Sequence, residues 1–182
     1  MAKKILEYLH ELCYSIFRVE VSEEGGVNMD NKELTVFDIA NFFRSKEKMT
    51  HKKLQKLVYY AYAWYIALYN ENKDEIYNRL CKNTKFEAWV HGPVCPELYH
   101  QFSNNYGIVD KFKGDLNSNI TGDLKKFLEL VYKTFGKYSG DELETMTHKE
   151  MPWQNARNTL KPYEPSNEAI SESDMFVYYN NI

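Results

Sequence analysis

Apolar residues recur every three or four positions between residues 51 and 70, the spacing that places them on one face of an α-helix. Thr50 precedes this stretch and can cap the helix with its hydroxyl group. From Leu57 onward the segment is apolar or aromatic on nearly every side. A helix without a polar face has to be covered on most sides, so the pattern predicts that this helix forms the centre of the core.

Shorter amphipathic patterns predict further helices. One begins at Thr35, with Asp38 three residues later as its capping partner, and another begins at Pro96 and runs to about residue 104. The other predicted helices cover residues 3–18, 121–135, 141–150, 152–157 and a last segment that begins at Ser171 or Ser173. The pattern of a strand is found over residues 85–91, and a second short strand is expected around Ile108.

These patterns predict a single α+β domain that is predominantly α-helical and has a small sheet of two or three strands. The length of 182 residues suits one domain with a sizeable core. Residues 20–32 are polar and contain two glycines, which is typical of a linker. We therefore expect an N-terminal extension over residues 1–30, made of a helix and a linker, followed by the main domain over residues 31–182.

Met29 is a second candidate start of translation. Glu24, Gly25 and Gly26 can be encoded by a purine-rich sequence that matches a bacterial ribosome-binding site a few nucleotides upstream of the Met29 codon. Under this hypothesis residues 1–28 are an upstream extension, whereas the helical pattern over residues 3–18 favours real structure there. Mass spectrometry of the native protein distinguishes the two starts.

The segment over residues 86–99 contains a sharp change of direction. Gly92 permits backbone angles that other residues avoid, and Pro93 cannot donate to a sheet ladder. Pro96 suits the first turn of a helix, where its missing N–H costs nothing. We therefore expect a strand, a corner at Gly92 and Pro93, and then a helix, and such a corner either defines the fold or belongs to a recognition surface.

Aromatic residues make up 15% of the chain, with 15 tyrosines against 10 phenylalanines and 3 tryptophans. Tyrosine has an apolar ring and a hydrogen-bonding tip, so it suits half-buried and interface positions. These tyrosines either line an amphipathic core or form an exposed binding surface, and the sequence leaves both interpretations open.

The net charge of −3 argues against general nucleic-acid binding, which needs a basic surface. Lys52, Lys53 and Lys56 are interpreted as a solvated helix face. No run of 18 apolar residues and no signal peptide is found, so we expect no membrane span. The three cysteines lack metal-ligand spacing and fit free thiols in a reducing cytoplasm, so we expect a cytoplasmic protein.

His148 and Glu150 form the most enzyme-like pattern in the chain. Two positions apart on a helix, their side chains point about 200° away from each other, so they converge only if the helix ends there. Pro152 makes such an end feasible. The alternatives are a hydrolase-like or metal-binding enzyme that uses both residues, and a helix end whose polar groups fix the turn at Pro152 and Trp153. We favour the second, and we expect no cofactor and no bound metal.

Four short blocks occur in series along the chain. They are Leu54-Gln55-Lys56-Leu57-Val58-Tyr59-Tyr60-Ala61 followed by Trp64; Glu87-Ala88-Trp89-Val90-His91-Gly92-Pro93-Val94-Cys95-Pro96 followed by Leu98 and Tyr99; Tyr138-Ser139 followed by Leu143; and Thr147-His148-Lys149-Glu150-Met151-Pro152-Trp153 followed by Ala156-Arg157. In order and spacing they resemble the SocA-like antitoxin family, also called the Panacea domain, which is found in the phage-associated protein GepA.

The resemblance implies a prokaryotic or phage protein that acts as the antitoxin of a toxin–antitoxin pair. It implies a cognate toxin protein as the partner, neutralised by direct binding. One member of the family resembles a proteolytic adaptor, so an ATP-dependent protease is a second expected partner. Neither role needs catalysis by this chain, so we expect that it is not an enzyme.

Within these blocks we expect two groups of residues around one surface. The partner-binding candidates are the aromatic residues Trp89, His91, Tyr99, Trp153 and Tyr59. The candidates that fix the backbone around them are Gly92, Pro93, Pro96, His148, Glu150 and Pro152.

Overall fold

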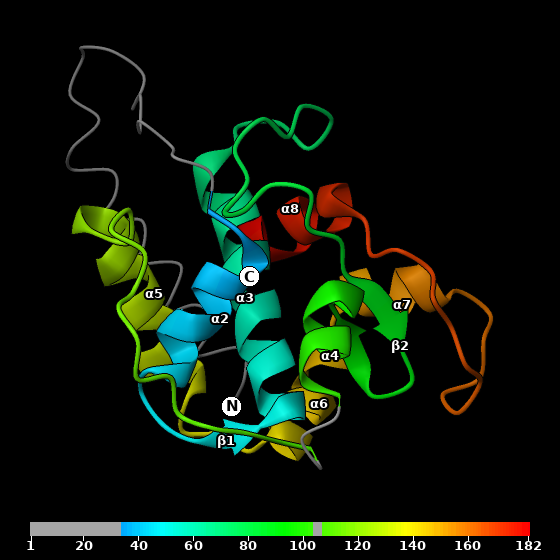
Figure 1. The fold of residues 1–182 in the computed structure, drawn as a ribbon. Helices are drawn as coiled ribbons and strands as arrows, with labels where there is room; N and C mark the ends of the chain where they lie inside the picture. The colour runs from blue at the N-terminus through cyan, green and yellow to red at the C-terminus, as the bar shows by residue number, and fades with distance from the viewer. Residues whose placement is uncertain (1–33, 104–106) are drawn as a thin grey trace.

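The computed structural model describes residues 34–103 and 107–182 (Figure 1). The predicted helix over residues 3–18 and the Met29 start lie outside these residues, and the division into an extension and a main domain stays a prediction. The described residues form seven helices and two small antiparallel sheets. This arrangement confirms the predominantly α-helical α+β single domain.

Helix α3 (His51–Tyr69) is the centre of the molecule, as its pattern predicts. Figure 1 shows it running through the middle of the fold, with other helices on several sides. Every side chain from Leu54 to Ala67 is buried, which explains why the sequence offers no polar face there. The helices in contact with α3 are α2 (Val36–Arg44), α4 (Pro96–Phe102), α5 (Gly122–Phe135), α6 (Gly140–Thr147) and α8 (Glu172–Asn180).

Most helix starts agree with the caps read from the sequence. Thr35 and Asp38 form a reciprocal capping box at the start of α2, and Thr50 accepts a hydrogen bond from the Lys53 N–H at the start of α3. Ser171 caps α8. Pro152 lies in the first turn of α7 (Met151–Arg157), where its missing N–H is tolerated.

The two sheets are short and tie loops to the helical core. Strand β1 (Met49–Thr50) pairs with β4 (Ile108–Val109) in antiparallel register, Met49 opposite Val109. Strand β2 (Glu87–Trp89) pairs with β3 (Gly92–Val94), and the outer edge of β2 is covered by residues 168–170. This cover places the C-terminal part of the chain beside the hairpin.

The hairpin differs from the predicted strand and corner. The chain turns at Val90 and His91, and Gly92 and Pro93 belong to the second strand. Ala88, directly opposite Pro93, points its N–H away from β3 and donates to the carbonyl oxygen of Glu168 at 2.8 Å. Ala88 and Pro93 are therefore a non-hydrogen-bonded pair of the antiparallel ladder. The backbone nitrogen of Pro93 also points away from the partner strand, so the absence of an N–H group there costs no hydrogen bond.

A buried carboxyl group joins three helices in the core. Glu150, at the start of α7, accepts hydrogen bonds from the hydroxyls of Tyr60 at 2.8 Å and Tyr179 at 2.7 Å. These tyrosines belong to α3 and α8, so one side chain links α3, α7 and α8. Burial raises the pKa of Glu150 to about 7, although both hydroxyl contacts favour its charged form.

The raised pKa predicts a pH dependence of stability. Between the ordinary pKa near 4.5 and the folded value near 7, the folded protein holds a proton on Glu150 that the unfolded chain has lost, so stability falls as pH rises through this window. Glu150→Gln keeps one of the two acceptor oxygens and the size of the side chain, and it removes the titration. We expect a flatter dependence of the free energy of unfolding on pH over this window, measured by urea titration. An unchanged slope would contradict the assignment.

Candidate functional site

The candidate site lies at the β2–β3 hairpin and the start of α4, above the N-terminal half of α3. Gln55 of α3 holds the end of β3 from below. Its Oε1 accepts a hydrogen bond from the Cys95 N–H at 2.9 Å, and its Nε2 donates to the Cys95 carbonyl oxygen at 3.3 Å. One buried side-chain amide thus satisfies both backbone groups of the residue before Pro96, which fixes where α4 begins.

Lys56 holds the middle of the same strand. Its side chain is 1% exposed, and Nζ donates to the Pro93 carbonyl oxygen at 3.0 Å. Gly92 lies against it with φ +92°; a methyl group there would be 2.7 Å from Lys56 Cε and 2.8 Å from Thr147 Oγ1. Only glycine allows both this backbone angle and this approach. The interpretation of Lys56 as part of a solvated face is therefore wrong.

The ammonium group of Lys56 is in an unusual electrostatic setting. Burial lowers the pKa of Lys56 to about 7, against the attraction of Glu144. The chain thus buries an ionisable group at the base of the hairpin, and its protonation state changes near neutral pH.

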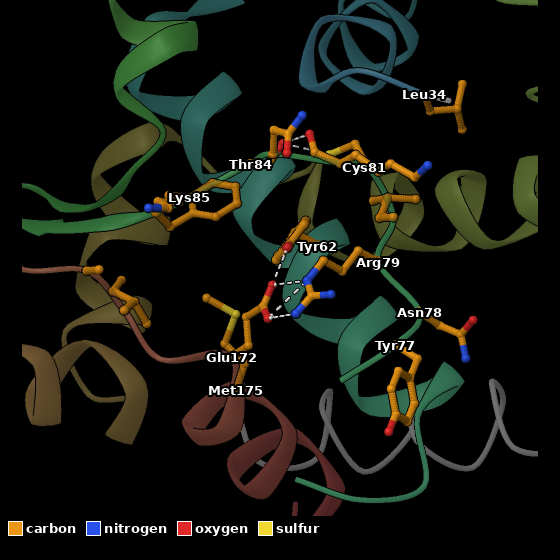
Figure 2. A pocket seen from close by; sticks show the side chains of 16 residues that line it. Leu34, Tyr62, Tyr77, Asn78, Arg79, Cys81, Thr84, Lys85, Glu172 and Met175 are labelled. Carbon is orange, nitrogen blue, oxygen red and sulfur yellow. Dashed lines mark hydrogen bonds and ion pairs between the residues drawn. The ribbon is translucent and has the colours of Figure 1, made fainter. Parts of the chain in front are cut away.

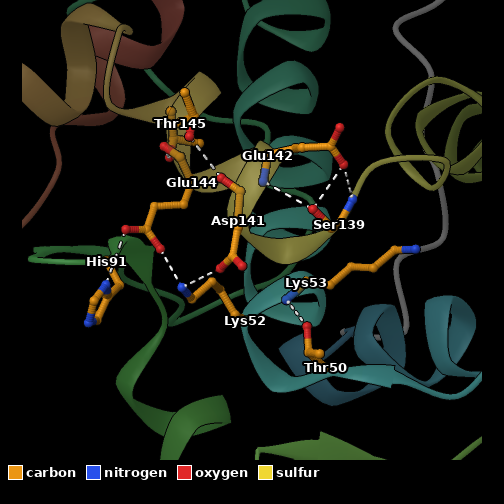
Figure 3. Close-up of polar contacts among 10 residues, drawn as sticks. Thr50, Lys52, Lys53, His91, Ser139, Asp141, Glu142, Glu144 and Thr145 are labelled. Atoms are coloured by element: carbon orange, nitrogen blue, oxygen red, sulfur yellow. Dashed lines mark hydrogen bonds and ion pairs between the residues drawn. The ribbon is translucent and has the colours of Figure 1, made fainter.

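Glu144 of α6 joins the hairpin turn to α3 at the surface. It accepts from His91 Nδ1 at 3.1 Å and pairs with Lys52 Nζ at 2.6 Å, while Lys52 also contacts Asp141 at 2.8 Å (Figure 3). Partial burial disfavours the charged carboxylate, but Lys52 and His91 outweigh it and lower the pKa of Glu144. The His91 side chain remains 70% exposed, so it is accessible from solvent.

Aromatic rings extend from the hairpin across α4. The ring of Trp89 lies 4.8 Å from that of Tyr99, which in turn stacks on His51 at 5.1 Å. Trp89 is half-buried and Tyr99 is 36% exposed, whereas His51 is buried beneath them. We call Trp89, His91 and Tyr99 the corner surface.

A second layer supports this surface. Trp153 is 6% exposed and donates its indole N–H to the Trp89 carbonyl oxygen at 3.0 Å, and His148 stacks on Trp153 at 4.1 Å. Arg157 is buried, and its guanidinium donates to the carbonyl oxygens of Ala88 at 2.9 Å and Glu164 at 2.6 Å. These contacts hold β2 against α7 and the loop that follows it.

The structure brings together only some of the predicted partner-binding residues. The rings of Trp89 and Tyr99 are in contact, His91 is exposed in the adjoining hairpin turn, and Trp153 lies beneath Trp89 with little exposure. Tyr59 is fully buried in α3, so the expectation that it lies near the surface is wrong. The cause is the complete cover of α3, which makes its tyrosines core residues. Contact between the corner surface and a partner stays a prediction.

The residues considered for catalysis are engaged separately. The Glu150 carboxyl group is bound by Tyr60 and Tyr179 in the core, while His148 stacks on Trp153. Burial lowers the pKa of His148. Over residues 34–103 and 107–182, no three histidine, cysteine or acidic side chains lie close enough together to hold a metal ion.

Sequence reasoning missed the buried polar residues Gln55, Lys56 and Arg157. A signal was present for Lys56: Tyr59 and Tyr60, one turn further along the helix, and Ala63, two turns along, are apolar or aromatic, so Lys56 continues a buried face. The sequence carries no such signal for Arg157. Its partners are backbone carbonyl oxygens, which every residue has, so no pattern of residue types predicts its burial.

The sequence that forms the central helix and the hairpin matches a known family. Residues 54–154 match the antitoxin SocA-like, Panacea domain family, which is more than half of the chain, so the chain belongs to this family. It is 32% identical over 117 residues to Antitoxin SocA of Caulobacter vibrioides (strain NA1000 / CB15N).

That alignment covers 58% of this chain and 58% of the relative, so the chain spans less than two thirds of the relative's length. No solved structure matches the chain.

The close contact of Gly92 with Lys56 and Thr147 can be tested by comparing alanine substitutions at Gly92 and at a second glycine with positive φ. Gly92→Ala adds a methyl group to a strained backbone and forces it against Lys56 and Thr147, so we expect a loss of about 2–4 kcal/mol in the free energy of unfolding. Gly107 also has a positive φ but no atom within 4 Å of an added methyl group. Gly107→Ala should therefore lose only about 1 kcal/mol. Equal losses in urea titrations would contradict the packing argument.

The buried Lys56 predicts a second pH dependence. Between the folded pKa near 7 and the ordinary value of 10.5, the unfolded chain holds a proton that the folded protein lacks, so stability rises with pH in this window. Lys56→Met keeps the length of the side chain and removes the titration. Urea titrations from pH 7 to pH 10 should then show a shallower rise for the variant, and parallel curves would rule out a neutral Lys56.

Proposed function

We propose that this chain is an antitoxin that neutralises a toxin by binding it directly through the corner surface. The observation that carries the proposal is the pair of half-exposed rings, Trp89 and Tyr99, on a backbone that Gln55 and Lys56 brace from below. Tryptophan and tyrosine are enriched among the residues that contribute most of the binding energy in protein interfaces. Membership of the antitoxin SocA-like family supports the role.

Pre-organisation is the physical advantage of this surface. The hairpin is fixed by hydrogen bonds to its main chain, so little conformational entropy is lost when a partner binds. His91 adds a polar group at the rim that is already oriented by Glu144. Such a surface binds by shape and by apolar contact, and the toxin is neutralised because its own active surface is covered.

Delivery of the toxin to an ATP-dependent protease is the second route within this proposal. Both routes begin with the same binding step and differ in the fate of the toxin. With occlusion the toxin accumulates in an inactive complex, whereas with delivery its half-life falls when the antitoxin is present.

The proposal extends to the location of the protein. No helix in the described residues combines the length and the apolar character that crossing a bilayer requires. Cys81 and Cys95 are free and buried. We propose a cytoplasmic site of action, where thiols stay reduced.

The role is tested by co-expression. Expression of the neighbouring gene alone should arrest growth, and co-expression of this chain should restore it. A harmless neighbour, or a failure of rescue with well-expressed protein, would overturn the antitoxin proposal. Pulse-chase measurement of the toxin in the same cells separates occlusion from proteolytic delivery.

The corner surface is tested with two exposed tyrosines. Tyr99→Ala removes a ring of the proposed interface, so we expect the affinity for the purified toxin to fall at least about tenfold, or ~1.4 kcal/mol, by calorimetry. Tyr163→Ala removes a ring that is 69% exposed outside this surface and should leave the affinity unchanged. Equal effects of the two changes, or no loss with Tyr99→Ala, would argue against the corner surface.

A further inference from the structure

A pocket with a volume of about 610 Å³ lies apart from the corner surface. One wall is the irregular segment over residues 77–86, and the other is formed by residues 169 and 170 and the first turn of α8. Figure 2 shows Arg79 and Glu172 joined in the middle of this pocket, with Cys81 and Thr84 on one side and Tyr77 on the other. Volumes of this size accommodate drug-sized ligands or a few residues of a peptide.

The charged side chains that line the pocket are mostly basic, although the chain as a whole has a net charge of −3. Three basic residues, Arg79, Lys82 and Lys85, stand against one acidic residue, Glu172. Arg79 and Glu172 neutralise each other: Arg79 contacts Glu172 with Nη2 at 2.6 Å and Nε at 2.8 Å, and Tyr62 donates to Glu172 at 2.5 Å. Lys85 is exposed on the same wall, so this part of the pocket attracts negative charge.

The floor of the pocket is apolar. Phe86, Ile170, Met175 and Leu80 line it and are at most 5% exposed. A ligand that fits both the floor and the charged wall has to be amphipathic. A free phosphate or another small anion would leave the floor without contact.

Tyr77 stands at the rim on a fixed backbone. Its side chain is 76% exposed, the largest exposure among the apolar and aromatic side chains noted in the described residues. Asn70, at the end of α3, accepts from the N–H groups of Tyr77 at 2.9 Å and Asn78 at 2.8 Å and donates to the Asn78 carbonyl oxygen at 2.8 Å. An exposed ring on a braced backbone is suited to bind another molecule at low entropic cost.

The pocket is suited to non-covalent binding. Burial raises the pKa of its only cysteine, Cys81, to about 12, and the thiol contacts Thr84 Oγ1 at 3.2 Å. The thiolate that a nucleophile requires is therefore disfavoured at neutral pH.

We propose that this pocket binds an extended acidic segment of another polypeptide. An apolar side chain of that segment rests on the floor formed by Phe86, Ile170 and Met175. Its carboxylates lie near Lys85, and Tyr77 covers the segment at the rim. The site is additional to the corner surface, with which it shares no residue.

The test uses fluorescence anisotropy with the full chain and a fluorescein-labelled peptide of alternating glutamate and leucine. We expect saturable binding that weakens as salt is added, because the charges are solvent-accessible. Lys85→Glu reverses an exposed charge at the pocket, and Tyr77→Ser removes the ring at the rim. Each should weaken binding about tenfold. Lys133→Glu, an exposed reversal on α5 outside the pocket, is the matched control and should have no effect.

Several results would overturn the proposal. These are no binding by the wild-type chain, equal binding of a peptide with lysine in place of glutamate, or an equal effect of Lys133→Glu. Displacement of the peptide by a single-stranded oligonucleotide would assign the pocket to nucleic acid. Self-association in the ultracentrifuge that Lys85→Glu abolishes would assign it to a second copy of the chain. Tyr99 does not line the pocket, so the Tyr99→Ala variant should bind the peptide like the wild-type chain. Peptide binding by this variant therefore tests the pocket independently of toxin neutralisation.

Discussion

The complete burial of residues 54–67 of α3 is the constraint on which the rest of the structure depends. Covered polar side chains lose contact with water, so a partner within the protein stabilises them. Gln55 and Lys56 reach the main chain of β3 and of the residue that follows it, and Tyr60 reaches Glu150. The positions of the hairpin, of α7 and of α8 relative to α3 follow from these few contacts.

The same constraint explains why the site is both rigid and accessible. The side chains of Trp89 and Tyr99 contact each other at the surface, while the backbone that carries them is held from inside by groups that solvent does not reach. Arg157 and Trp153 hold the neighbouring strand in a similar way. If the same rings stood on a flexible loop, the entropy lost when the loop becomes ordered would offset much of the free energy of binding.

Much of the fold is predictable because it depends on local signals. The stripe of α3, the capping pair of Thr35 and Asp38, and the prolines at the starts of α4 and α7 all act within a few residues of the chain. The hairpin turn at Val90 and His91 was not predicted, since the glycine and proline that suggested a corner are placed by contacts with Lys56. Tyr59 was misplaced because hydrophobic periodicity cannot distinguish a covered tyrosine from an exposed one. The pocket lies along an irregular segment without periodicity, so its basic residues gave no pattern.

The inward-facing supports of the hairpin bind main-chain atoms. Gln55 binds both backbone groups of Cys95, Lys56 binds the carbonyl of Pro93, and Arg157 binds the carbonyls of Ala88 and Glu164. None of these five bonds involves the side chain of the supported residue, and the exposed side chains of Trp89, His91 and Tyr99 take no part in them. Substitutions of the exposed residues can therefore leave the geometry of the hairpin unchanged. Relatives with the same fold can in this way differ in the partner that they bind.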